Sequence, residues 1–217
     1  MKRRELSLRL AGVAALAALG LRPDAAAAQG KFVEGKDYAT LKKPVPLPSS
    51  GRVEVVEFFW YGCPHCFAFE PVLEPWVAQL PPDVHFRRVA YGFDEALREV
   101  HQRVYYTWEA LDVVGTMHTR TFERFHTQRK PINTEADMLE FAGESGLDVA
   151  KVKAAWNGFS MPVKLRQVRD FCDSYGVDFV PQIGVQGRYL TAPSMAGDGP
   201  KALAATDSLI ALVRKGG

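Results

Sequence analysis

Residues 53–66 read VEVVEFFWYGCPHC, and this stretch decides the fold. The segment Val53–Trp60 is mostly β-branched or aromatic, which is typical of a strand. Apolar residues then recur at helical spacing to about Leu80, which indicates a helix directly after the strand. The cysteines Cys63 and Cys66 therefore lie one helical turn apart at the start of that helix.

Two thiols at this spacing can form a disulfide or supply half of a tetrahedral metal site. The sequence favours a redox-active pair over the metal site, because it contains no second Cys-x-x-Cys and no closely spaced histidine pair. A purely structural disulfide is the third interpretation, but a four-residue ring constrains the unfolded chain little. Three other histidines, His101, His118 and His126, are scattered over predicted helices, and we expect them at the surface.

The start of this helix favours a thiolate at Cys63. Pro64 suits the first helical turn, where its missing amide hydrogen costs nothing. The free amides and the helix dipole favour negative charge there, and His65 can donate a hydrogen bond to the sulfur. Stabilising the thiolate stabilises the reduced protein, so the disulfide should be a strong oxidant. We expect Cys66 to turn into the core and to be the less accessible thiol.

The N-terminus has the pattern of a secretory signal peptide, which we place at residues 1–28. A basic head that includes Arg3 and Arg4 precedes the apolar stretch Leu10–Leu21, and Ala25–Ala28 offers a cleavage site. The apolar stretch is short for a membrane span, although an uncleaved anchor is the alternative. The paired arginines leave twin-arginine export open beside the general secretory route. Export would bring the chain to a compartment where disulfides persist.

Composition excludes other classes of function. The chain has 27 basic and 25 acidic residues, a net charge of +2, so we expect no nucleic-acid partner. Three cysteines are too few for a disulfide-stapled scaffold. The third, Cys172, shares a helical stripe with apolar residues, and we expect a buried, inert thiol. The sequence indicates no cofactor and no metal, and we expect a monomer.

The remaining chain alternates between strand and helix patterns. Pro71 and Pro75 predict a kink or a break in the first helix. Residues 93–160 are all helical and lie between strand-rich flanks, so we interpret them as an insertion into an α/β domain formed by 29–92 and 161–217. The predicted elements are strands at Val53–Trp60 and Val84–Tyr91, helices near 66–80, 97–111, 116–128, 134–145, 148–156 and 163–175, a hairpin at 183–190 and a helix at 199–214.

The run Phe58–Cys66 resembles the active-site segment of the DsbA family of periplasmic thiol oxidases. Further similar segments are Glu34–Tyr38, Ala154–Asn157, Gly176–Pro181 and Gly187–Tyr189. Together these segments extend the resemblance over essentially the whole mature chain.

The resemblance implies a thioredoxin fold with an inserted all-helical domain, and an enzyme that donates its disulfide to unfolded exported proteins with free thiols. Cys63 would form the mixed disulfide and Cys66 would resolve it. A quinone-linked membrane oxidase of the DsbB type would restore the disulfide. The resemblance also implies that Pro181 is cis and packs against the motif, and that Val180 and Pro64 help to bind the substrate strand.

The resemblance also places Glu57 where the family carries a buried acid, which could relay the proton of Cys66. We expect Glu54 and Glu70 to be solvated. Gln182 departs from the family pattern, since small residues are frequent after the proline, so we expect the chemistry of the groove to differ from that of the family. Two alternatives stay open: a disulfide isomerase or reductase, and a thioredoxin-fold binding module without redox turnover.

Overall fold

The computed structural model describes residues 32–47 and 51–216, so the expected signal peptide lies outside the described residues. The strands are β1 (Tyr38–Thr40), β2 (Val53–Phe59), β3 (Val84–Ala90), β4 (Gln182–Val185) and β5 (Tyr189–Thr191). The helices are α1 (Pro64–Val77), α2 (Glu95–Ala110), α3 (Val114–His126), α4 (Glu135–Glu144), α5 (Val149–Trp156), α6 (Met161–Tyr175), α7 (Pro193–Ala196) and α8 (Gly199–Arg214). In this part of the chain no helix has the length and apolar character needed to cross a membrane.

The strands form one five-stranded sheet in the order β1-β5-β4-β2-β3. β2 pairs in parallel with β3, while every other pairing is antiparallel. All seven residues of β2 are buried, because neighbouring strands flank it and helices cover it on both faces. The strand that leads to the two cysteines is therefore rigidly held.

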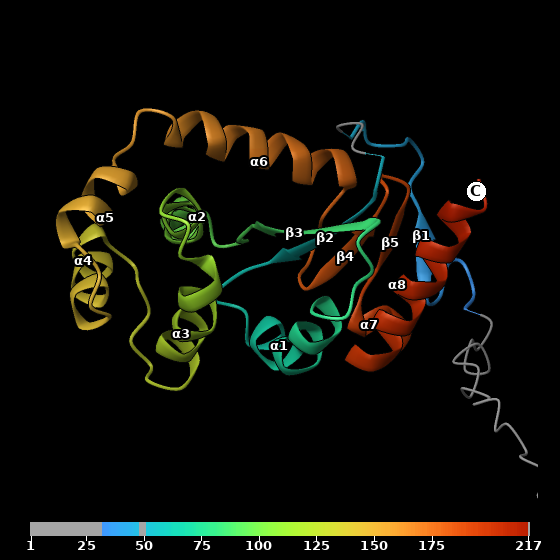
Figure 1. The fold of residues 1–217 in the computed structure, drawn as a ribbon, viewed down its shortest axis with the longest axis horizontal. Coiled ribbons are helices and arrows are strands. Elements are labelled where there is room, and N and C mark those ends of the chain that lie inside the picture. The colour runs from blue at the N-terminus through green and yellow to red at the C-terminus, as the bar shows by residue number, and fades with distance from the viewer. Residues whose placement is uncertain (1–31, 48–50, 217) are drawn as a thin grey trace, which may run out of the picture. The chain divides into compact units, whose positions relative to one another are not determined.

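Helices cover both faces of this sheet (Figure 1). On one face, Val55 and Ile183 share an apolar cluster with Leu73 of α1 and Leu209 of α8. On the other face, the Phe58 ring packs 5.0 Å from the ring of Tyr175 in α6. Successive residues of β2 thus face opposite layers.

The insertion predicted between the two halves of the α/β domain is present as α2 to α5, which lie between β3 and α6 in the chain. Its core includes Trp108, Phe122 and Met138, none of which exposes measurable surface. Side chains of β2 and of the insertion share one apolar cluster, so the insertion packs directly against the segment that carries the cysteines.

The predicted break in the first helix is wrong, and the predicted kink stays a prediction. α1 is one unbroken helix although Pro71 and Pro75 lie inside it. Both prolines are exposed, so water can bond the carbonyls that lose their partners. The short elements β1 and α7 were not predicted, because three or four residues are too few to show a periodic pattern.

Candidate active site

Cys63 is the N-cap of α1, and Pro64 occupies the first turn of this helix, as predicted. The Cys63 sulfur accepts a hydrogen bond from the amide of Cys66 at 3.4 Å. Both cysteines are free thiols, so the structure describes the dithiol form. The helix start thus presents its unpaired amides to the sulfur of Cys63.

These contacts lower the pKa of Cys63 from 9.0 to about 6. The largest cause is a hydrogen bond from the Cys66 thiol, and the amides of Cys66 and His65 and the charge of His65 act in the same direction. Burial opposes the shift, but it is the weaker effect. Cys63 is therefore mostly a thiolate at neutral pH, which is the form that reacts in exchange.

Cys66 has the opposite character. Its side chain is fully buried, and burial, followed by the hydrogen bond to Cys63, raises the pKa of its thiol well above 9.0. The asymmetry agrees with the expectation that Cys66 faces the core. When the disulfide is reduced, Cys66 must take up a proton while Cys63 keeps its charge.

A groove of about 460 Å³ lies beside the cysteines. His65 and Val180 line it, and its floor is mostly apolar, with Phe69, Val72 and Pro181. His65 is exposed, so its ring can meet an incoming chain. The groove can accept an extended segment of another protein next to Cys63.

The Val180–Pro181 peptide bond is cis, as the resemblance implied. The carbonyl oxygen of Val180 lies 3.6 Å from the Cys63 sulfur, so this loop closes over the motif. The next residue, Gln182, is buried, and its side-chain oxygen has no hydrogen-bond partner among the described residues. Gln182 pairs with Phe58 in the sheet.

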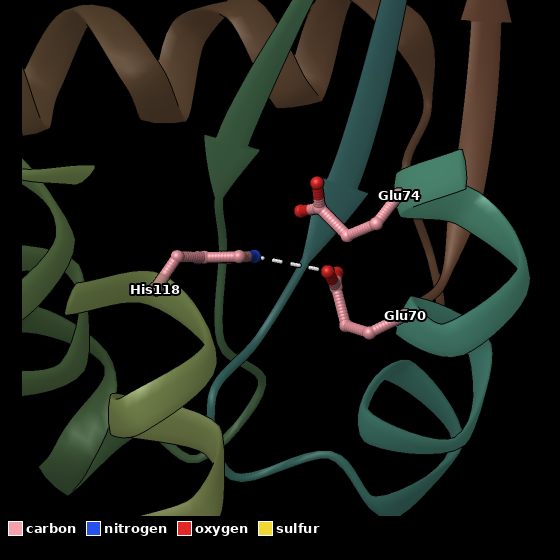
Figure 2. A group of neighbouring side chains, drawn as sticks. All are labelled: Glu70, Glu74 and His118. Carbon is pink, nitrogen blue, oxygen red and sulfur yellow. Dashed lines mark hydrogen bonds and ion pairs between the residues drawn. The ribbon is translucent and has the colours of Figure 1, made fainter. Parts of the chain in front are cut away.

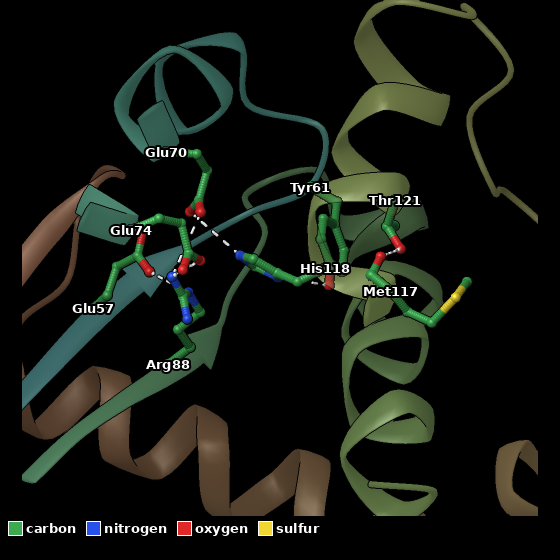
Figure 3. Close-up of polar contacts among 8 residues, drawn as sticks. All are labelled: Glu57, Tyr61, Glu70, Glu74, Arg88, Met117, His118 and Thr121. Carbon is green, nitrogen blue, oxygen red and sulfur yellow. Dashed lines mark hydrogen bonds and ion pairs between the residues drawn. The ribbon is translucent and has the colours of Figure 1, made fainter. Parts of the chain in front are cut away.

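Glu57 is fully buried and faces Arg88, its partner in the parallel ladder (Figure 3). Arg88 Nε lies 2.9 Å from Glu57 Oε2, yet among the described residues neither Glu57 oxygen accepts a well-aligned hydrogen bond. Burial, followed by the negative charge of Glu70, raises the pKa of Glu57 to about 8. The charge of Glu57 also acts on the pKa of Cys66.

Glu70 was expected in solvent, and this prediction is wrong, since Glu70 is buried on the inner face of α1. Its oxygens lie 3.5 Å from Arg88 Nη2 and 3.3 Å from His118 Nε2. Burial raises the pKa of Glu70 to about 7, and Arg88 opposes this shift. Glu54 is likewise buried, because Arg87 bonds its carboxylate at 2.9 and 3.0 Å.

Glu70, Glu74 and His118 point toward one another from α1 and α3 (Figure 2). Two carboxylates and an imidazole can hold a divalent cation. Here a guanidinium already supplies the positive charge, because Arg88 Nη2 lies 2.6 Å from Glu74 and also approaches Glu70. The donor set is therefore occupied by an internal cation, and it does not point to a metal.

The prediction of surface histidines on the insertion is also wrong. His101 and His118 are 3% exposed, and His126 is half-buried. His101 Nδ1 accepts from Trp60 Nε1 at 2.6 Å, and His126 Nε2 donates to the Tyr61 carbonyl at 2.8 Å. The helical spacing was read correctly, but the sequence alone does not show which helix faces pack on another domain.

Arg88 was not singled out from the sequence. The signal that could have found it is a basic residue inside an apolar strand, next to a strand that carries an acid. Cys172 is fully buried as predicted, and burial raises the pKa of its thiol. It lies in α6 within the apolar cluster, which fits an inert thiol.

Comparison with known proteins agrees with this site. Residues 54–204 match the model of the DSBA-like thioredoxin domain. The thiol:disulfide interchange protein DsbA of Pseudomonas aeruginosa is 36% identical over 85% of this chain and 87% of its own length. The corresponding protein of Bordetella parapertussis is 36% identical over 95% of this chain and 97% of its own length.

Solved structures show the same architecture. The crystal structure of Pseudomonas aeruginosa DsbA has a TM-score of 0.81 and 36% identity, and the match covers 85% of this chain and 96% of that one. DsbA from Xylella fastidiosa gives a TM-score of 0.78 at 29% identity, with 85% and 98% covered. The predicted thioredoxin fold with a helical insertion is thereby confirmed. With its Cys63–Cys66 pair at the start of α1, the chain belongs to the DsbA family of thiol:disulfide oxidoreductases.

Proposed function

We propose that this member of the family is an exported thiol oxidase that donates the Cys63–Cys66 disulfide to newly exported proteins. A substrate thiolate attacks the Cys63 sulfur, and Cys66 leaves and takes up a proton. A second substrate thiolate then attacks the substrate sulfur of the mixed disulfide, and Cys63 leaves as a thiolate. The substrate loses two electrons and gains a disulfide, and the enzyme becomes the dithiol.

The observation that carries this direction is the low pKa of Cys63, about 6, at the N-cap of α1. A stabilised thiolate favours the reduced enzyme and is a good leaving group. Both effects favour transfer of the disulfide from the enzyme to a substrate. A reductase would need the opposite balance.

The groove beside the motif supports a role in binding unfolded chains. His65, Val180 and Pro181 line this groove. The backbone of Val180 would pair with an extended substrate strand, and Pro64 would contact that strand next to Cys63. The same groove would receive a thiol-bearing loop of a quinone-linked membrane oxidase of the DsbB type. That partner would remove two electrons and the proton of Cys66 from the reduced enzyme, because Cys63 is already a thiolate.

We further propose that residues 1–28 are a cleaved signal peptide and that the mature protein works in the periplasm. Residues 29–92 and 161–217 would form the thioredoxin-like domain, and 93–160 the insertion. The ends of α5 at Trp156 and of β3 at Ala90 support these boundaries. Mass measurement of protein from the periplasmic fraction tests the cleavage site.

The oxidase function is tested by mixing the oxidised protein with a reduced, unfolded protein that contains two cysteines. We expect one substrate disulfide for each enzyme consumed. Cys63→Ser should abolish the transfer, and Cys172→Ser is the matched control that should retain it. Unchanged transfer by Cys63→Ser would contradict the proposal, and rapid reshuffling of wrongly paired substrates without net oxidation would favour an isomerase.

A further inference from the structure

His118 connects the insertion to both ends of the active-site segment. It lies in α3 with 3% of its surface exposed. Its Nδ1 lies 2.9 Å from Tyr61 Oη, two residues before Cys63. Its Nε2 lies 3.3 Å from Glu70 Oε1, one turn after Cys66 on α1. Figure 3 shows this chain of contacts running from Tyr61 through His118 to the acids around Arg88.

The surroundings of His118 fix where its single proton lies. Burial, together with Arg88, lowers the pKa of His118 well below 6.5, so the ring is neutral and carries one N–H. Burial raises the pKa of Tyr61 well above 10.0, so the phenol keeps its hydrogen. The charge of Arg88, whose Nη2 lies 3.5 Å from Glu70, favours the carboxylate form of Glu70, and a carboxylate can only accept, which assigns the N–H to Nε2. Tyr61 then donates to Nδ1, and both neighbours favour the same tautomer.

The two buried acids, Glu57 and Glu70, therefore have different hydrogen-bond donors around them. Glu70 receives the His118 Nε2–H bond and also faces Arg88 Nη2. Glu57 has the ion pair with Arg88 Nε but no well-aligned hydrogen bond from the described residues. Each donor near a carboxyl favours its charged form, and among the described residues Glu70 has two such neighbours, at 3.3 and 3.5 Å, whereas Glu57 has the guanidinium of Arg88 alone, at 2.9 Å.

The cluster also carries more negative than positive groups. Three carboxyls, those of Glu57, Glu70 and Glu74, face the single guanidinium of Arg88. Two of these acids are buried, so full ionisation would leave uncompensated charge in the core. The cluster is thus expected to keep one proton near neutral pH, and its pKa values agree, at about 8 for Glu57 and about 7 for Glu70.

We propose that His118 is a positioning residue of the exchange reaction, because it holds Glu70 as a carboxylate and so leaves the shared proton on Glu57, beside Cys66. This inference rests on the proposed oxidase function and on the proton relay through Glu57 that the family resemblance implies. When Cys66 leaves as a thiolate, Glu57 gives it the proton and becomes the carboxylate that pairs with Arg88. On reoxidation Cys66 returns the proton to Glu57. The titratable or charged groups that face His118 are Tyr61, Glu70, Glu74, Arg88 and Tyr105.

The inference is tested with His118→Leu, which removes both ring nitrogens. Without its donor, Glu70 should bind the proton more tightly, and a neutral Glu70 no longer raises the proton affinity of Glu57. The alkaline limit of the pH profile for substrate exchange should move down by roughly one pH unit, the scale of one hydrogen bond to a charged group. Infrared spectra should show the protonated-carboxyl band moving from Glu57 to Glu70, with the band identified by Glu57→Gln and Glu70→Gln.

Three further variants make the result specific. His118→Gln keeps an N–H donor and should restore the pH profile at least in part. Tyr61→Phe keeps the ring but removes the hydroxyl that fixes the tautomer, so it should shift the profile in the same direction by less, and it serves if His118→Leu does not fold. His101→Gln is the matched control, since His101 is equally buried in the insertion and bonds Trp60 rather than the acids.

The outcomes separate the two proposals. If a folded His118→Leu or Tyr61→Phe protein keeps the wild-type profile and the band on Glu57, the role of His118 is overturned. If Glu57→Gln changes neither the exchange rate nor any carboxyl band in the wild-type protein, the relay itself fails. If His101→Gln shifts the profile as His118→Leu does, the effect is general loosening and the inference is wrong.

Discussion

At the scale of single residues, the reaction depends on a difference between two neighbouring thiols. Cys63 accepts hydrogen bonds at the start of a helix, and Cys66 faces the core one turn later. The same four residues therefore provide one sulfur that holds a charge and one that requires a proton. This division gives the exchange its direction.

The first prediction concerns His65, whose charge and amide both lower the pKa of Cys63. His65→Ala removes the charge but keeps the amide, so the pKa of Cys63 should rise and the oxidant should weaken. Ultraviolet absorbance of the thiolate, followed against pH, measures the shift. Identical titration curves for the two proteins would show that the imidazole has no such role.

The second prediction is the pH dependence of the reduced protein. The folded pKa of Cys63, about 6, lies below its reference value of 9.0, so its contribution to stability is complete above pH 9 and is lost as pH falls through 6. Cys66 stays protonated in the folded state, and its ionisation near pH 9 in the unfolded state is shared by Cys63→Ser and cancels in the comparison. Urea unfolding of the wild type and of Cys63→Ser, compared at each pH, isolates the contribution. A stability difference that stays flat between pH 6 and 9 would contradict it.

Sequence patterns predicted the chemistry of these residues well, but they did not predict which other residues surround them. The helix start, the spacing of the thiols and the position of Glu57 follow from local order along the chain. The burial of Glu70 and His118 does not, because each is solvated or buried according to which distant helix packs on it. Nothing in the local sequence around Glu70 or His118 indicates that a distant helix packs on it.

At the scale of elements, turns fix how β4 and β5 approach the loop near Val45. Gly187 lies in the turn between these strands with φ +63°, and an added Cβ would collide with the Val45 carbonyl oxygen. Strand ends and helix lengths were predicted to within three residues, since they follow from periodicity. The sequence did not predict the close approach of the Val45 loop to the Gly187 turn, because that contact depends on tertiary packing.

The third prediction follows from this turn. Gly187→Ala should destabilise the protein by about 2 to 4 kcal/mol, since it adds a clash to the cost of left-handed backbone. Gly176→Ala is the matched control: its φ is +67°, but nothing lies within 4 Å of an added Cβ, so about 1 kcal/mol is expected. Urea denaturation measures both. If both variants lose the same unfolding free energy, the structure relaxes the contact between residue 187 and Val45 without cost, and the prediction is wrong.

At the scale of the whole molecule, the insertion takes part in building the site. Its three histidines bond Trp60 and Tyr61, the residues that lead from β2 to Cys63. β3 supplies Arg88 and α1 supplies Glu70 to the same cluster. The sequence correctly predicted an inserted helical block, but it could not show that this block completes the surroundings of the cysteines.

The central claim is that the protein donates disulfides, and the equilibrium of the Cys63–Cys66 pair with glutathione tests it most directly. A low-pKa thiolate at the helix start predicts an oxidising potential, near the reference value of about −120 mV for DsbA. A potential near the value of about −270 mV for thioredoxin would contradict the account and make the protein a reductant.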